Sequence, residues 1–258
     1  MTATNNQYPM TNTQQPIIEN RHIQLGSTWI HYQTAGSGPP LVLVHGLASS
    51  TRWWRKNIAG LAEHFRVYAV DLSDFGNRRF RPRFVLSQAA HYLVRWLEAL
   101  QIERASFIGH SMGGRIAAEL AAEHPIRVDR LVLVDAAIMP FGHGYLKQSW
   151  GMARSFRRIP FSLLHVLLFD TLYTGIFSVM RIGRELLKSN LEHKVPHIQA
   201  PTLIIWGEHD TIVPLALGQA LHRQLTGSQF NLIHGVGHVP MWEKPKEFNQ
   251  AALQFLVQ

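Results

Sequence analysis

The sequence predicts an α/β fold in which a mainly parallel sheet is covered by helices on both faces. Short, almost uninterrupted apolar runs recur along the chain and alternate with amphipathic or alanine-rich stretches. Such runs are typical of strands that are buried on both faces, as parallel sheets require. The 258 residues, of which 46% are hydrophobic, are enough to bury one substantial core.

The apolar runs also give the order of the elements. An extended lead-in near residues 21–33 adds antiparallel edge strands, and helices are predicted at 86–100 and 115–123. The predicted buried strands are 41–44, 66–72, 104–108 and 131–134, followed by two that begin at Thr202 and Phe230. An insert at about 138–197 interrupts the alternation.

The chain is predicted to form a single domain over residues 17–258, after a mobile polar tail at 1–16. The tail is rich in Thr, Asn and Gln and lacks the basic start and apolar core of a secretory signal, so we expect a cytoplasmic protein. The chain has no cysteine, which excludes disulfides, thiolate metal sites and a cysteine nucleophile.

Ser111 lies in the motif Gly109-His110-Ser111-Met112-Gly113, between a predicted strand and a predicted helix. A serine at such a sharp turn adopts a strained backbone, and the flanking glycines let neighbouring backbone pass close by. The free N–H groups of the helix start favour negative charge beside the hydroxyl. The pattern therefore predicts a nucleophile, although a serine that only caps the helix fits the same residues.

Asp210 and His238 follow two further predicted strands, each in a glycine-containing turn. The carboxyl ends of parallel strands meet along one edge of a sheet, so Ser111, Asp210 and His238 can come together there. An imidazole that removes the serine proton, and a carboxylate that stabilises the imidazolium, together make a nucleophilic centre.

With these motifs, the chain resembles the α/β-hydrolase superfamily from about Ile23 to its C-terminus. The supporting segments, in family order, are His45-Gly46-Leu47, Gly109-His110-Ser111-Met112-Gly113-Gly114, Gly207-Glu208-His209-Asp210, and Gly237-His238-Val239-Pro240 followed by Glu243 and Pro245. The resemblance implies an α/β-hydrolase catalytic domain whose insert forms a helical cap. It also implies that Ser111 is the nucleophile, His238 the base, Asp210 the supporting acid, and the backbone amides of Leu47 and Met112 the oxyanion hole.

Other residues could compete for these roles. Asp135 ends a predicted strand and is an alternative triad acid, but Asp210 is preferred. His234 and His238 are separated by glycines, which predict a loop and not a metal-binding helix face. His45 and His110 are interpreted as structural or pocket-lining residues. We expect neither a metal nor a cofactor.

Two segments depart from the family pattern. Asp74 and Arg78 interrupt the pattern expected in the loop 73–78, and Leu47 stands where one lipase type has a run of glycines after the first histidine. The second departure argues against a lipase of that type. We assign no site residue from the loop.

The basic charge of the chain leaves several partners to consider. The net charge is +8, but the basic residues are scattered and form no nucleic-acid recognition motif. The insert 138–197 carries eight Lys and Arg against three Asp and Glu, a net charge of +5. Either it is a basic cap in solution, or it associates weakly with an anionic membrane surface. Arg78, Arg79, Arg81 and Arg83 could attract an anionic substrate, although they also fit a solvated surface.

The predicted function is a serine hydrolase that cleaves a small or medium hydrophobic carboxylic ester through an acyl-enzyme, with no obligate protein partner. A carbon–carbon bond hydrolase uses the same three side chains, so the motifs do not separate it from an esterase. A perhydrolase, an acyltransferase and a hydrolase-like ligand receptor with little turnover are further alternatives. Aspartate-based dehalogenases and epoxide hydrolases are disfavoured because Ser111 occupies the nucleophile position.

Overall fold

The computed structural model describes residues 16–26, 28–72, 84–139 and 160–258. Within these residues eight strands form one sheet in the order β1-β2-β4-β3-β5-β6-β7-β8. The strands are β1 (Glu19–Leu25), β2 (Thr28–Ala35), β3 (Pro40–Val44), β4 (Arg66–Val70), β5 (Ala105–His110), β6 (Val128–Val134), β7 (Thr202–Gly207) and β8 (Gln229–Ile233). β2 pairs antiparallel with β1 and β4, and the pairs from β4 to β8 are parallel. The predicted sheet type is confirmed.

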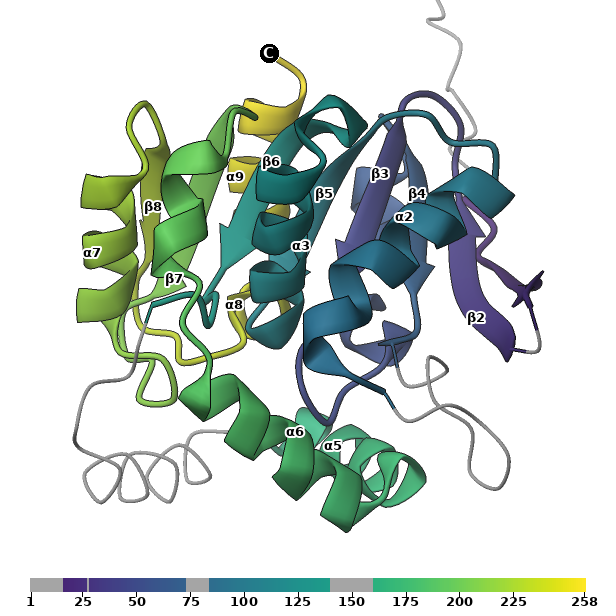
Figure 1. Cartoon of the computed structure of the whole chain (residues 1–258), viewed down its shortest axis with the longest axis horizontal. Helices are drawn as coiled ribbons and strands as arrows, with labels where there is room; N and C mark the ends of the chain where they lie inside the picture. Colours follow the sequence, from purple (N-terminus) through teal and green to yellow (C-terminus); the bar gives the residue numbers. More distant parts are fainter. Residues whose placement is uncertain (1–15, 27, 73–83, 140–159) are drawn as a thin grey trace, which may run out of the picture.

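Helices connect the strands and cover both faces of the sheet (Figure 1). The α-helices are α1 (Ile58–Leu61), α2 (Ala89–Ala99), α3 (Met112–Glu123), α5 (Phe161–Thr174), α6 (Ile176–Lys188), α7 (Leu215–Gln224), α8 (Pro240–Glu243) and α9 (Pro245–Leu256). Short 3-10 helices are η1 (Thr51–Trp54), η3 (Leu86–Gln88), η4 (Pro125–Arg127) and η5 (Glu192–His197). Helix α3 begins three residues before the predicted start, because Gly113 and Gly114 in its first turn weaken the helical signal.

The core consists of two layers, one on each face of the sheet. Along β3, Val42 and Val44 pack into one layer, whereas Leu41 and Leu43 pack into the other. Side chains of α2, α3 and α7 complete the first layer, and those of α1, α8 and α9 complete the second. Burial on both faces explains why these strands read as continuous apolar runs.

Helices α5 and α6 lie across the edge of the sheet at which the parallel strands end (Figure 1). Both belong to the predicted insert, and we call them the cap helices. Among the described helices, none alone has the length and hydrophobicity of a membrane span. Only α5 and α6 taken together do, and they are bent by 94° relative to each other.

Several predictions concern residues outside the described ranges. They are the tail up to residue 15, the loop 73–78 with the neighbouring arginines up to Arg83, and part 140–159 of the insert.

Candidate active site

Ser111 occupies the turn between β5 and α3, as predicted. Its backbone angles, φ 53° and ψ −116°, lie in a region that non-glycine residues rarely adopt. The turn is held from both sides, because the Ser111 N–H donates to the Val134 carbonyl at 2.9 Å and the Ser111 carbonyl accepts from the Ala137 N–H at 3.1 Å. These bonds to the end of β6 fix the strained serine.

The glycines of the motif are required by close backbone packing. A Cβ atom at Gly109 would lie 2.6 Å from the Gly113 carbonyl oxygen, and one at Gly113 would lie 2.3 Å from the Val44 carbonyl oxygen. Only glycine fits where the start of α3 passes so close to the ends of β3 and β5. The predicted reason for these glycines is thus confirmed.

Asp210 and His238 form the second part of the site. Asp210 follows β7, and its Oδ2 lies 2.7 Å from His238 Nδ1. Its other oxygen accepts hydrogen bonds from the N–H groups of Ile212 at 2.8 Å and Val213 at 3.0 Å. The carboxylate is buried and well supplied with donors, so it can orient the imidazole and stabilise its charged form.

Ser111 and His238 line the same cavity, Ser111 in the turn after β5 and His238 in the loop after β8. The hydrogen bonds among the described residues include His238–Asp210 but none between Ser111 Oγ and His238. In free enzymes the serine–histidine bond is commonly long and shortens when substrate binds. The geometry brings the three residues to one site, and their catalytic roles stay a prediction.

The peptide between Gly46 and Leu47 is oriented by two side chains. The Leu72 N–H donates to His45 Nε2 at 2.8 Å, so Nδ1 carries the proton that is donated to the Gly46 carbonyl, also at 2.8 Å. Ser49 Oγ donates to the same carbonyl at 2.8 Å. In a trans peptide the N–H points opposite to the C=O, so these bonds fix the direction of the Leu47 N–H.

The second predicted oxyanion donor, the Met112 N–H, belongs to the first residue of α3. N–H groups in the first turn of a helix have no partner within that helix. The amide is therefore available to an oxyanion beside Ser111. The roles of Leu47 and Met112 as oxyanion donors remain predictions.

Two further side chains hold the loop that carries His238. His110 Nε2 lies 2.7 Å from the His238 carbonyl oxygen and donates to it, while burial holds the pKa of His110 well below its usual range. Glu243 Oε1 accepts the Gly237 N–H at 3.0 Å, and burial raises the pKa of Glu243. The interpretation of His110 as structural or pocket-lining agrees with this position, although the sequence does not indicate its contact with the His238 backbone.

Asp135, the alternative acid, lies at the end of β6 in a fully buried position. Its Oδ1 accepts the Gly207 N–H at 2.9 Å, and its Oδ2 has no hydrogen-bond partner among the described residues. Burial, and then the charge of nearby Asp210, raise its pKa well above the usual range. Burial therefore favours the neutral form of the Asp135 carboxyl, whereas Asp210 makes the hydrogen bond to His238 Nδ1.

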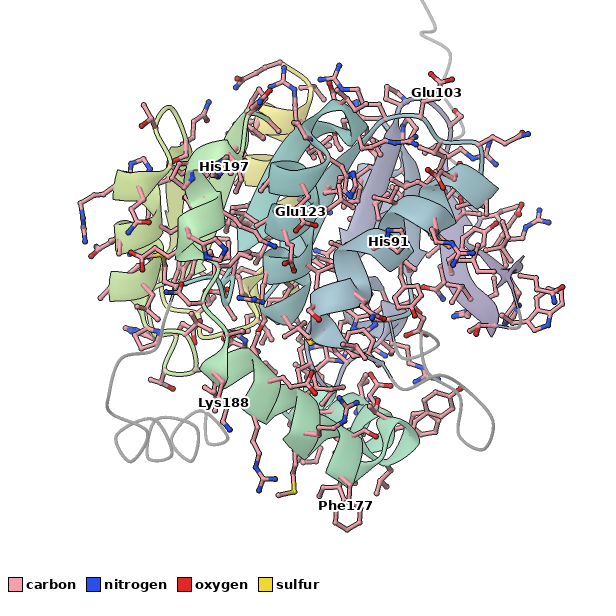
Figure 2. The ribbon with its side chains drawn as sticks, in the orientation of Figure 1. His91, Glu103, Glu123, Phe177, Lys188 and His197 are labelled. Carbon is pink, nitrogen blue, oxygen red and sulfur yellow. The ribbon has the colours of Figure 1, made fainter. Side chains whose placement is uncertain are left out.

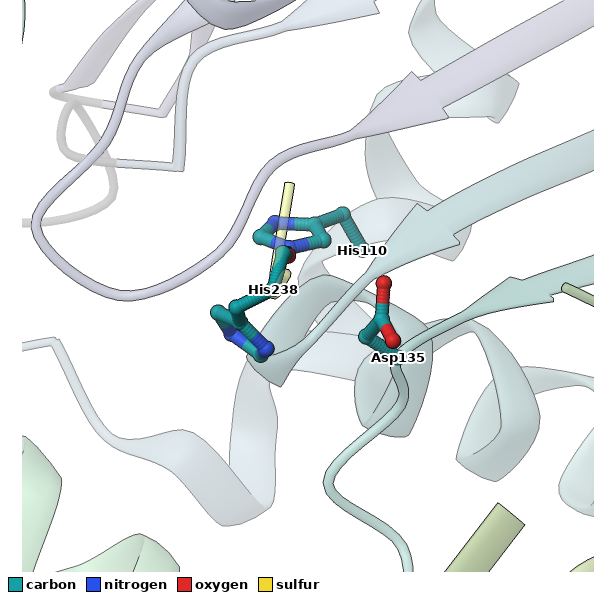
Figure 3. A group of neighbouring side chains, drawn as sticks. All are labelled: His110, Asp135 and His238. Atoms are coloured by element: carbon teal, nitrogen blue, oxygen red, sulfur yellow. The ribbon is translucent and has the colours of Figure 1, made fainter. Parts of the chain in front are cut away.

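His110, Asp135 and His238 are close enough together to be considered as metal ligands (Figure 3). One ligand atom from each lies within 4.8 Å of the others. One nitrogen of each imidazole is already used, in the bonds to Asp210 and to the His238 carbonyl. These bonds account for Nδ1 of His238 and Nε2 of His110, and we assign no metal to the cluster. His234 lies in a loop, as predicted.

The cavity beside Ser111 has a volume of about 580 Å³. Ser111 and His238 are among the residues that line it, and many of the others are aliphatic side chains of the cap helices, such as Leu163, Leu167 and Val179. No lysine or arginine lines it among the described residues. The site thus combines a polar reacting end with an apolar compartment, which suits an uncharged hydrophobic group.

Asp170, which the sequence analysis did not single out as an anchor, attaches the cap to the main body. It is buried in α5, and three groups donate to its carboxylate: Ser50 Oγ at 2.8 Å, Arg52 Nη1 at 2.7 Å and Trp53 Nε1 at 3.1 Å. Trp53 also lines the cavity. The sequence does contain a signal for this contact, namely an aspartate in an otherwise apolar stretch, because a buried carboxylate requires hydrogen-bond partners.

Known proteins that resemble this chain in sequence or structure indicate its family. The model of the alpha/beta hydrolase family matches residues 41–251. A putative non-heme haloperoxidase of Mycobacterium phage D29 is 31% identical, and the match covers 78% of this chain and 82% of that protein. A 2-hydroxy-6-oxo-6-phenylhexa-2,4-dienoate hydrolase of Comamonas testosteroni is 27% identical over 89% of this chain and 91% of its own. The crystal structure of a bacterial membrane phospholipase A has a TM-score of 0.81 at 26% identity and covers 93% of this chain and 86% of its own.

Proposed function

Because this chain belongs to the alpha/beta hydrolase family, we propose that it is a serine hydrolase that cleaves a small or medium carboxylic ester with an apolar acyl group. The observation that carries the proposal is the cavity of about 580 Å³, which is lined by Ser111, His238 and many aliphatic side chains. An apolar acyl chain gains free energy by leaving water for such walls.

In the first half of the reaction Ser111 Oγ attacks the ester carbonyl carbon, and His238 Nε2 removes the hydroxyl proton. The carbonyl oxygen becomes an oxyanion, which accepts hydrogen bonds from the Leu47 and Met112 amides. Asp210 stabilises the imidazolium through the Nδ1 bond. His238 then gives its proton to the departing alcohol, and the acyl group remains on Ser111.

In the second half, water replaces the alcohol. His238 removes a proton from the water as the water oxygen attacks the acyl carbon. Collapse of the second oxyanion breaks the bond to Ser111, which recovers its proton from His238. The carboxylic acid leaves, and the reaction consumes only the ester and water.

The cavity walls also bear on the alternative of carbon–carbon bond cleavage. The dienoate acted on by the Comamonas relative carries a carboxylate, and burial of a carboxylate without a cation is costly. The described cavity walls offer no lysine or arginine to pair with it. An ester that presents an apolar acyl chain suits these walls better, and the similarity to a phospholipase A supports the same choice.

The test is the rate of hydrolysis of p-nitrophenyl esters of increasing acyl length, measured beside a ring-cleavage dienone. We expect kcat/KM to rise from acetyl to medium-length acyl groups, with no cleavage of the dienone. Ser111→Ala should abolish turnover, and Asp210→Asn should lose most of it while the fold is retained. A preference for the dienone over every ester would refute the proposal.

A matched control is Ser228→Ala, because Ser228 bonds His222 in the turn before β8 and is remote from the cavity. Its turnover should equal that of the unaltered protein. Hydrolysis that persists in Ser111→Ala at the rate of this control would exclude Ser111 as the nucleophile.

A further inference from the structure

The cap helices expose an apolar surface that is unusual for this molecule. Six of their large apolar side chains are more than half exposed, and Phe161 and Phe177 reach 89% and 85%. We call these six residues the apolar cap face: Phe161, Leu168, Phe169, Leu172, Ile176 and Phe177. Figure 2 shows Phe177 at the outer end of the cap helices, pointing away from the sheet.

The concentration of these side chains distinguishes them from ordinary exposed apolar residues. The large apolar residues exposed elsewhere in the described ranges lie before β1, in β2, in η4 and after α9, and they are Ile17, Ile18, Trp29, Ile126 and Val257. Single exposed residues of this kind need no explanation. Six such residues on two consecutive helices indicate a surface that meets an apolar partner.

Positive charge follows the apolar cap face along α6. On α6, exposed Arg184 and Lys188 follow Phe177 by seven and eleven residues, which is close to two and three helical turns. Neither has an ion pair with another described residue, whereas the neighbouring Glu185 is held by Arg181 at 2.6 Å. Figure 2 shows Lys188 at the end of the cap helices away from Phe177. The helix thus presents an apolar end and a cationic end.

We propose that the apolar cap face inserts into the surface of an anionic lipid bilayer, with Arg184 and Lys188 at the level of the lipid phosphates. Apolar side chains next to unpaired cations are the combination that interfacial helices use. A second copy of this chain is a poorer partner, because its surface would bring the same positive charges together.

The position of the active-site cavity supports this partner and rests on the proposed function. Leu168 and Ile176 belong both to the apolar cap face and to the lining of the cavity that contains Ser111. An apolar ester in the outer part of a bilayer could therefore pass into the cavity along a continuous apolar surface. This avoids the cost of exposing its acyl chain to water.

The test is co-sedimentation of the full chain with vesicles at low and high salt. One set consists of phosphatidylcholine alone, and the other also contains phosphatidylserine. The protein carries Ser111→Ala, so lipid hydrolysis cannot alter the vesicles. We expect stronger binding to the anionic vesicles and weaker binding at high salt.

Two double variants separate the contributions. Phe161→Ser with Phe177→Ser should reduce partitioning at least about tenfold, since these exposed rings do not line the cavity. Arg184→Gln with Lys188→Gln should reduce binding to anionic vesicles at low salt by about thirtyfold. The control Ile126→Ser removes an 82% exposed side chain before β6, at the opposite edge of the sheet, and should bind as the parent does.

Three results would overturn the inference. They are a failure to sediment with anionic vesicles, equal sedimentation of the phenylalanine double variant and its parent, and a lipid-free dimer that this double variant abolishes. Binding by Ser111→Ala, together with no ester hydrolysis by the unaltered chain, would refute the proposed function and leave this inference intact. Hydrolysis of soluble short esters without vesicle binding would support the proposed function and refute this inference.

Discussion

The attachment of the cap through Asp170 gives a prediction whose size follows from the contacts. Asp170→Asn keeps the shape of the side chain but replaces one acceptor oxygen with an amide N–H. That N–H would face groups that are themselves donors, namely Ser50 Oγ, Arg52 and Trp53 Nε1. We expect the variant to loosen α5 from the body.

The magnitude can be estimated from the three bonds. A hydrogen bond to a charged group contributes about 1.5–3 kcal/mol, and the remaining amide oxygen can keep one or two of these contacts. Arg52 is half exposed, so its contribution is small, and loss of the buried charge returns part of the desolvation cost that raises the pKa of Asp170. The net loss should be about 2 kcal/mol, which corresponds to about 4–8 °C in Tm.

Two measurements check this estimate. Compared with the unaltered protein, Asp170→Asn should have a lower Tm, and its hydrogen exchange should accelerate more in α5 than in α3. The control Glu247→Gln makes the same carboxylate-to-amide change in an exposed pair with Lys244, and should shift stability by less than about 0.5 kcal/mol. An unchanged Tm together with unchanged exchange in α5 would refute the role of Asp170 as the anchor of the cap.

Three further predictions concern the site. Asp135→Asn should retain activity. Its free energy of unfolding relative to the unaltered protein should increase as pH rises above about 4, by at most about 1.4 kcal/mol per pH unit, because the pKa of Asp135 is higher in the folded protein than in the unfolded chain. Urea unfolding at several pH values measures this, and a difference between the two proteins that does not change with pH would contradict it. Ser49→Ala should lower kcat about fivefold by loosening the peptide that carries the Leu47 amide, and an unchanged kcat would count against that coupling. His110→Ala should lower kcat about 10- to 100-fold by releasing the His238 backbone, and equal kcat values for variant and parent would exclude this positioning role.

The sequence predicted the parts of the molecule that depend on local patterns. Continuous apolar runs identified the buried strands, and the turn positions of Ser111, Asp210 and His238 placed all three at one edge of the sheet. The choice of Asp210 over Asp135 agrees with the structure, because Asp210 makes the bond to His238 Nδ1. Both acids come shortly after a strand, so local sequence alone could not settle which one faces the imidazole.

The remaining features depend on contacts between distant segments. Asp170 meets Ser50 across 120 residues, and His110 meets the His238 carbonyl across 128 residues. No periodicity or local motif records such contacts, which arise only when the strands and the cap have assembled. The start of α3 was missed for another reason, since the close packing that requires Gly113 also weakens the helical pattern.

The central claim is that Ser111 is a nucleophile activated by His238, and covalent labelling tests it most directly. The chain would be treated with a fluorophosphonate, and the adduct located by peptide mass spectrometry. We predict one adduct, on Ser111, that is absent from Ser111→Ala and forms far more slowly in His238→Ala. An adduct on another residue, or equally fast labelling without His238, would contradict the claim.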